Sequence, residues 1–233
     1  MSHTASANVA QEMADVLREN VEEIRPRLRG WLHAATAPLA FVSFLVLMVV
    51  ADQRVVRIGV AVFMVSALAL FTCSAIYHTR TWPEEMRLLW KRIDHANIFL
   101  LIAGSYTPFC LLVLDTRDSL VLLSLVWVGA LAGIAFRVFW VEAPRWLYVP
   151  LYVVLGGTAT LYWGEFKAGA PATVLRLIVL GGVLYALGAV VYGFKRPNPW
   201  PAWFGFHEVF HALTILAFAT TYIGLSLLAY QQS

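Results

Sequence analysis

Residues 55–78 read V-V-R-I-G-V-A-V-F-M-V-S-A-L-A-L-F-T-C-S-A-I-Y-H, an apolar run long enough to cross a lipid bilayer. A transmembrane helix needs about 20 such residues, and a backbone in lipid must pair its polar groups internally. The run lacks the alternation of apolar and polar residues that a membrane β-strand shows. We therefore expect residues 55–78 to form a membrane-spanning helix that ends at His78.

The rest of the chain repeats this pattern. Of the 233 residues in the whole chain, 60% are hydrophobic and 13% are charged, whereas soluble domains carry about 25% charged residues. So much apolar surface cannot be buried in a core of this size, which places the protein in a membrane. We expect residues 31–233 to form one all-α domain, a seven-transmembrane-helix bundle with approximate spans at 31–50, 55–78, 93–114, 119–140, 146–163, 172–194 and 206–229.

Residues 1–30 are polar and form a tail before the first span. Between residues 8 and 29, apolar side chains recur at helical spacing with acids and arginines between them. This pattern predicts an amphipathic helix at the membrane surface or against the bundle, with a solvated tail as the alternative. The tail has no apolar segment followed by a small-residue cleavage site, so we expect no cleavable signal peptide.

Lysines and arginines give the expected orientation. Twelve of them lie in the N-terminal tail and in the second, fourth and sixth loops, against five on the opposite side. Because cytoplasmic loops are richer in these residues, we expect a cytoplasmic N-terminus and a short C-terminus outside. The net charge of +3 is small, and no basic run is interleaved with aromatics. We therefore expect no nucleic-acid partner.

Five polar side chains lie inside the predicted spans. Ser74 and His78 end the second span, Asp94 begins the third, and His207 and His211 begin the seventh. Ionisable groups are costly in lipid, so each is a functional candidate. With the predicted orientation, all five lie within about two helical turns of the cytoplasmic face.

The spacing of these residues favours a metal site. His207 and His211 are four residues apart, so both rings can face one ion, and Ser74 and His78 have the same spacing. Three neutral imidazoles that leave one position open suit Zn²⁺. Asp94 could hold a water in that position and accept its proton, and Ser74 could bond the same water or a substrate carbonyl. A proton relay or a polar network between helices is the alternative.

The sequence H-E-V-F-H at 207–211 also matches the H-E-x-x-H signature of zinc proteases, in which the glutamate is the general base. Here the third ligand would come from another helix, and Asp94 is already placed for the water. We therefore assign Glu208 a secondary role. His33 and His95 are interpreted as hydrogen-bonding residues at helix ends, because a lone histidine there is more often a polar partner than a ligand.

Longer strings around these residues resemble a known family. They are S-A-I-Y-H at 74–78, D-H-A-N-I-F-L-L-I-A-G-S-Y-T-P at 94–108, G-G-V-L-Y-A-L-G-A-V-V-Y at 181–192 and F-G-F-H-E-V-F-H at 204–211. Together they resemble the hemolysin III family, the bacterial branch of the progestin and adiponectin receptor (PAQR) family, which is grouped with the alkaline ceramidases. The resemblance implies a seven-helix bundle in the plasma (bacterial inner) membrane. It also implies a zinc ion near the cytoplasmic side, held by His78, His207 and His211, with Ser74 and Asp94 beside it.

The chain departs from that family at the entrance to the first span. Members of the bacterial branch typically carry Glu-x-x-Asn-x-x-Thr-His there, whereas residues 25–33 read R-P-R-L-R-G-W-L-H. Only His33 of the family pattern remains.

Four functions are compatible with these residues. The first is a zinc-dependent hydrolase of membrane lipid amides or esters, with Asp94 and Ser74 as catalytic residues and a role in lipid homeostasis. The second is a non-catalytic receptor or regulator with a structural zinc. The third is a pore-forming cytolysin. The scarcity of charged residues within the spans argues against it, because few side chains could line a channel. An intramembrane protease is the fourth.

Overall fold

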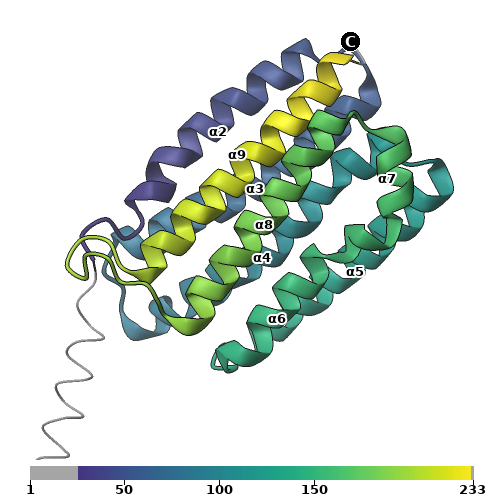
Figure 1. Ribbon diagram of the computed structural model, residues 1–233. Helices are drawn as coiled ribbons and strands as arrows, with labels where there is room; N and C mark the ends of the chain where they lie inside the picture. The colour runs from purple at the N-terminus through teal and green to yellow at the C-terminus, as the bar shows by residue number, and fades with distance from the viewer. Residues whose placement is uncertain (1–25, 232–233) are drawn as a thin grey trace, which may run out of the picture.

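The computed structural model of the protein describes residues 26–231, and six long helices dominate this part of the chain. Each is long and apolar enough to cross a membrane. They are α2 (Trp31–Val50), α3 (Arg54–Thr79), α4 (Glu84–Val113), α5 (Thr116–Phe139), α8 (Ala172–Phe194) and α9 (Phe206–Gln231). The predicted all-α bundle is confirmed (Figure 1). Most of the predicted amphipathic helix, residues 8–25, lies outside the described residues.

A seventh passage is helical but broken. It consists of α6 (Arg145–Gly156), the 3₁₀-helix η1 (Thr158–Tyr162) and the short α7 (Trp163–Gly169). The structure therefore differs from the single span predicted over residues 146–163. None of these three pieces is among the six helices of spanning length.

The break follows the glycine pair Gly156–Gly157. The N–H of Gly157 donates to the carbonyls of Val153 and Val154, a tightening typical of helix ends. The Tyr106 hydroxyl of α4 donates to the Gly156 carbonyl and accepts a hydrogen bond from the Ala159 N–H. Backbone groups freed by the break are thus paired within the protein, as lipid surroundings require.

Helices that follow one another in the chain pack together, and α9 closes the bundle against α2. α3 packs on α2 and α4, α4 packs on α5, and α9 packs on α8 and α2. Figure 1 shows α2, α9 and α8 side by side, with α5 and α6 at the opposite edge. Fully or nearly fully buried phenylalanines join α2, α3 and α9 by edge-to-face contacts, namely Phe44, Phe63, Phe71 and Phe218.

α4 begins nine residues before the start predicted at residue 93. Pro83 precedes the helix, and Glu84 and Glu85 occupy its first turn, where carboxylates interact favourably with the helix dipole. These charged turns do not belong in lipid, so apolar run length could not reveal them. As a consequence Asp94 lies about three turns inside the helix.

Gly104 allows α3 and α4 to approach closely. A Cβ at this position would lie 2.6 Å from the Ser66 Cβ of α3, and the Ser66 hydroxyl is held by the carbonyls of Val62 and Phe63. We expect Gly104→Ala to force the helices apart and lower the free energy of unfolding by about 1–3 kcal/mol. Thermal unfolding in detergent would measure this. Gly182→Ala is the matched control, because nothing lies within 4 Å of a Cβ there, and its unfolding temperature should not fall.

Candidate metal centre

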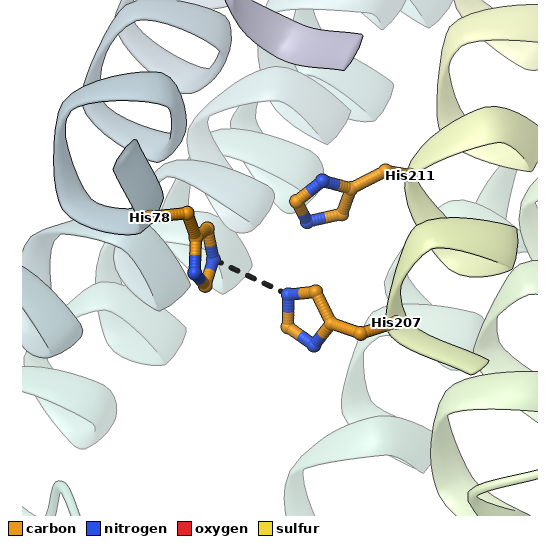
Figure 2. Close-up of side chains that lie close together, drawn as sticks. All are labelled: His78, His207 and His211. Atoms are coloured by element: carbon orange, nitrogen blue, oxygen red, sulfur yellow. Dashed lines mark hydrogen bonds between the residues drawn. The ribbon is translucent and has the colours of Figure 1, made fainter. Parts of the chain in front are cut away.

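The three predicted ligand histidines meet at the end of the bundle where α3 ends and α9 begins. His78 lies in the last turn of α3, while His207 and His211 lie in the first two turns of α9. Each offers one ring nitrogen to a group whose members all lie within 4.8 Å of one another. Figure 2 shows the three rings turned toward one another from the two helices. The cluster could therefore hold a metal ion.

The two closest nitrogens are those of His78 and His207. Their Nε2 atoms are 3.2 Å apart and are joined by the dashed line in Figure 2. A neutral imidazole has one N–H and one lone pair. One ring can therefore donate to the other, or both lone pairs can face a shared cation. The ring centroid of His211 lies 4.5 Å from that of His207 and 5.3 Å from that of His78.

Asp94 lies beside this group. Its Oδ2 is 3.7 Å from the Nε2 of His78 and also 3.7 Å from the Nδ1 of His95. At this separation the carboxylate makes no short hydrogen bond to either ring. The carboxylate is thus close enough to reach a molecule bound at the histidines, without belonging to the ligand group itself.

Ser74 supplies a buried hydroxyl at the same place. The residue is 1% exposed, and its Oγ has no hydrogen-bond partner in the described part of the chain. Buried polar groups are nearly always paired, with protein, water or ligand. An Oγ in this position is available to a bound water or to a substrate oxygen.

Glu208 faces a different partner. One carboxylate oxygen accepts a hydrogen bond from the Gly205 N–H at 2.8 Å, and the other accepts one from the Nε of Arg29 at 2.9 Å. The side chain is fully buried. A glutamate that pairs with a backbone N–H just before its helix fixes the helix start. One oxygen therefore holds the first turn of α9, next to His207, and the other is engaged by Arg29.

His95 is a hydrogen-bonding residue, as predicted. Its Nδ1 lies 2.8 Å from the Lys91 carbonyl, which can only accept, so the ring donates there. The Nε2 then accepts from the Tyr192 hydroxyl at 3.1 Å. A neutral ring paired in this way has no lone pair left for an ion.

The interpretation of His33 as a hydrogen-bonding residue is wrong. His33 is 2% exposed, and neither ring nitrogen has a hydrogen-bond partner among residues 26–231. Its ring stacks on that of His211, with centroids 3.9 Å apart and planes 10° apart. Its position near the start of the first span, at the same end of the bundle as the other histidines, was the signal that could have placed it here.

An apolar cavity of about 450 Å³ leads away from the centre. Ser74, Asp94, His207 and His211 belong to its polar wall. On α8 its lining runs from Leu175 to Tyr192, a length of about 25 Å at the rise of an α-helix. The volume lies within the range of small-molecule sites. The polar side chains therefore share one cavity with a long apolar passage.

The sequence matches the family described as Haemolysin-III related over residues 21–222. The chain belongs to this family. The family resemblance is thereby confirmed, and the haemolysin-III chain is a multi-pass integral membrane protein.

Individual relatives agree with this assignment. The chain is 34% identical over 139 residues to the Hemolysin-3 homolog of Bacillus subtilis (strain 168), covering 60% of this chain and 65% of that protein. It is 28% identical over 167 residues to Hemolysin-3 of Bacillus cereus, covering 70% and 76%. Similarity extends to the Adiponectin receptor protein of Drosophila melanogaster, 27% identical over 191 residues, with 74% of this chain but only 43% of that protein covered. The haemolysin-III family is therefore related to the adiponectin receptor proteins.

Proposed function

We propose that this haemolysin-III protein is a zinc-dependent hydrolase of membrane lipid amides or esters, similar to a ceramidase, that contributes to membrane lipid homeostasis. One observation carries the proposal. Three converging imidazoles lie beside a carboxylate and a buried hydroxyl that has no partner among the described residues, and four of these five side chains line a long apolar cavity, namely Ser74, Asp94, His207 and His211. Such a cavity suits the hydrocarbon part of a lipid, and the polar wall suits its amide or ester group.

The residues present fit a zinc ion. Imidazole nitrogens bind Zn²⁺ at about 2.0–2.1 Å in tetrahedral geometry, which puts two ligand nitrogens about 3.3 Å apart. The Nε2 atoms of His78 and His207 are 3.2 Å apart. Structural zinc sites use four protein ligands, whereas catalytic sites use three and keep one position open. The group found in the described residues has three members, which favours the hydrolase over a regulator with a structural zinc.

The chemistry divides between the ion and the chain. Bound zinc would supply Lewis acidity toward a carbonyl oxygen and would make a water more acidic. Asp94 would hold that water, take its proton as the water attacks the carbonyl carbon, and return it to the leaving nitrogen or oxygen as the bond breaks. Ser74 would donate a hydrogen bond to the carbonyl oxygen as negative charge develops on it.

The location of the protein in the membrane would let a lipid substrate reach the cavity directly from the bilayer. A lipid would enter the cavity from the bilayer, so the site needs no opening wide enough for a soluble substrate. We propose that the centre lies near the cytoplasmic face of the plasma membrane, because Lys and Arg are concentrated in the tail and in the loops at that end.

Purified protein incubated with ceramides and other N-acyl lipids in mixed micelles tests the proposal. We expect release of free fatty acid, its loss after treatment with a chelator, and its return with Zn²⁺ but not with Mg²⁺, because Mg²⁺ prefers oxygen ligands. Zinc-loaded protein that hydrolyses none of these lipids would instead favour a non-catalytic receptor or regulator; the Drosophila relative is named as a receptor. Dye release from vesicles that survives His207→Ala would favour a pore.

A further inference from the structure

Residues 26–33 run directly alongside the candidate metal centre. The Arg27 N–H donates to the Ala202 carbonyl at 3.1 Å, and the Leu28 N–H donates to the Trp203 carbonyl at 3.3 Å. The Arg27 guanidinium lies over the Trp203 ring, 4.6 Å from its centroid. The segment is thus tied to the loop that precedes α9, before it continues into α2.

Gly30 makes the first contact between residues 26–33 and the three ligand histidines, His78, His207 and His211. Its φ of 83° lies in the left-handed region, which glycine adopts without a steric penalty. A Cβ here would lie 2.8 Å from the His78 Cβ and 2.9 Å from the Thr79 Cγ2. The backbone of the segment therefore rests directly on His78, and only glycine allows so close an approach.

The second contact is the pair formed by Arg29 and Glu208. The Glu208 carboxylate is fully buried, and the Arg29 Nε donates to it at 2.9 Å. A buried carboxylate is costly unless it is paired and hydrogen-bonded. Glu208 is adjacent to His207 and also holds the first turn of α9. The pair thus fixes the helix that presents two of the three ligand histidines.

The third contact is the stack of His33 on His211. Ligand histidines are ordinarily oriented by a hydrogen bond from the nitrogen that does not bind the metal. The Nδ1 of His211 has no such partner within the described chain. The parallel ring of His33, 3.9 Å away, and the edge of Phe71 against His33 limit how the His211 ring can turn.

We propose that residues 26–33 form a brace that positions the metal-ligating histidines, with Arg29, Gly30 and His33 as its positioning residues. The proposal rests on the metal-binding part of the proposed function. Arg29 and Gly30 lie in the R-P-R-L-R-G stretch that directly precedes α2.

The rate at which purified full-length protein releases zinc to a chromophoric chelator tests the brace. We expect Arg29→Gln and His33→Ala each to raise the release rate by about tenfold or more, the effect of removing a partner that orients a metal ligand. His33→Phe keeps an aromatic ring against His211 and should remain within a few-fold of wild type. Arg87→Gln is the matched control, because Arg87 pairs with Glu84 at the protein surface.

A rescue variant separates positioning from general damage. Arg29→Gln leaves the Glu208 carboxylate buried without its cation, whereas Arg29→Gln with Glu208→Gln removes both charges. We expect the double variant to release zinc more slowly than Arg29→Gln alone. Cobalt-substituted protein gives a second measurement, because His33→Ala should change the visible absorption bands of the ion while His33→Phe should not.

The outcomes distinguish this proposal from the one before it. Retained zinc with wild-type release rates in Arg29→Gln and His33→Ala would overturn the brace alone. Equal release from His33→Phe and His33→Ala would overturn the stacking role of His33. Wild-type protein that retains no zinc would overturn the proposed function and the brace with it.

Discussion

Replacing Asp94 with asparagine is expected to abolish lipid-amide turnover while leaving the metal bound. Asparagine has nearly the shape of aspartate but cannot take a proton from water. General acid–base groups contribute about 10²–10⁴-fold to rate, so we expect kcat to fall by at least about 10²-fold. Asp94 lies 3.7 Å from the His78 Nε2 and is not a member of the ligand group, so the zinc content should be unchanged.

Fatty-acid release and zinc content would be measured on the same preparations. Asp118→Asn, in the first turn of α5, is the control, and its turnover should equal that of wild type. If Asp94→Asn hydrolyses lipid at the wild-type rate, Asp94 is not the base. If the variant loses both turnover and zinc, the carboxylate acts on the ion or on His78, and the proton must be taken by another group.

The long helices of this protein could be predicted because lipid constrains them so strongly. An apolar run of spanning length leaves a helix as the only available structure, and α2 and α8 begin and end at the predicted residues. The start of α4 could not be found in the same way, since its first turns are charged and lie outside the apolar run. The break after α6 also escapes hydropathy, because no charged residue lies between Arg145 and Glu165 on either side of Gly156–Gly157.

The ligand histidines could be found for a geometric reason. Four-residue spacing puts His207 and His211 on one face of α9, and alternating loops bring the end of α3 to the start of α9. His33 has no second histidine four residues away, and its stack on His211 depends on how α2 lies against α9. The Arg29–Glu208 pair joins residues 179 positions apart. Neither helical period nor loop order specifies a side-chain contact between segments so distant in sequence.

The loss of zinc from His78→Ala and from His207→Ala is the second large effect that we expect. The two residues come from different helices, so a shared requirement would show that α3 and α9 contribute to one ion. A site left with two imidazoles holds zinc far more weakly than one with three. His95→Gln is the control, because both nitrogens of His95 are engaged by Lys91 and Tyr192, and its zinc content should match wild type.

The most direct measurement is elemental mass spectrometry of the full-length protein, purified in detergent without chelator, beside these three variants. Circular dichroism on the same samples would confirm that the helices remain. We predict about one zinc per chain in wild type and His95→Gln, and almost none in His78→Ala and His207→Ala. Folded wild-type protein without metal, or folded His78→Ala that keeps its zinc, would contradict the account of this site.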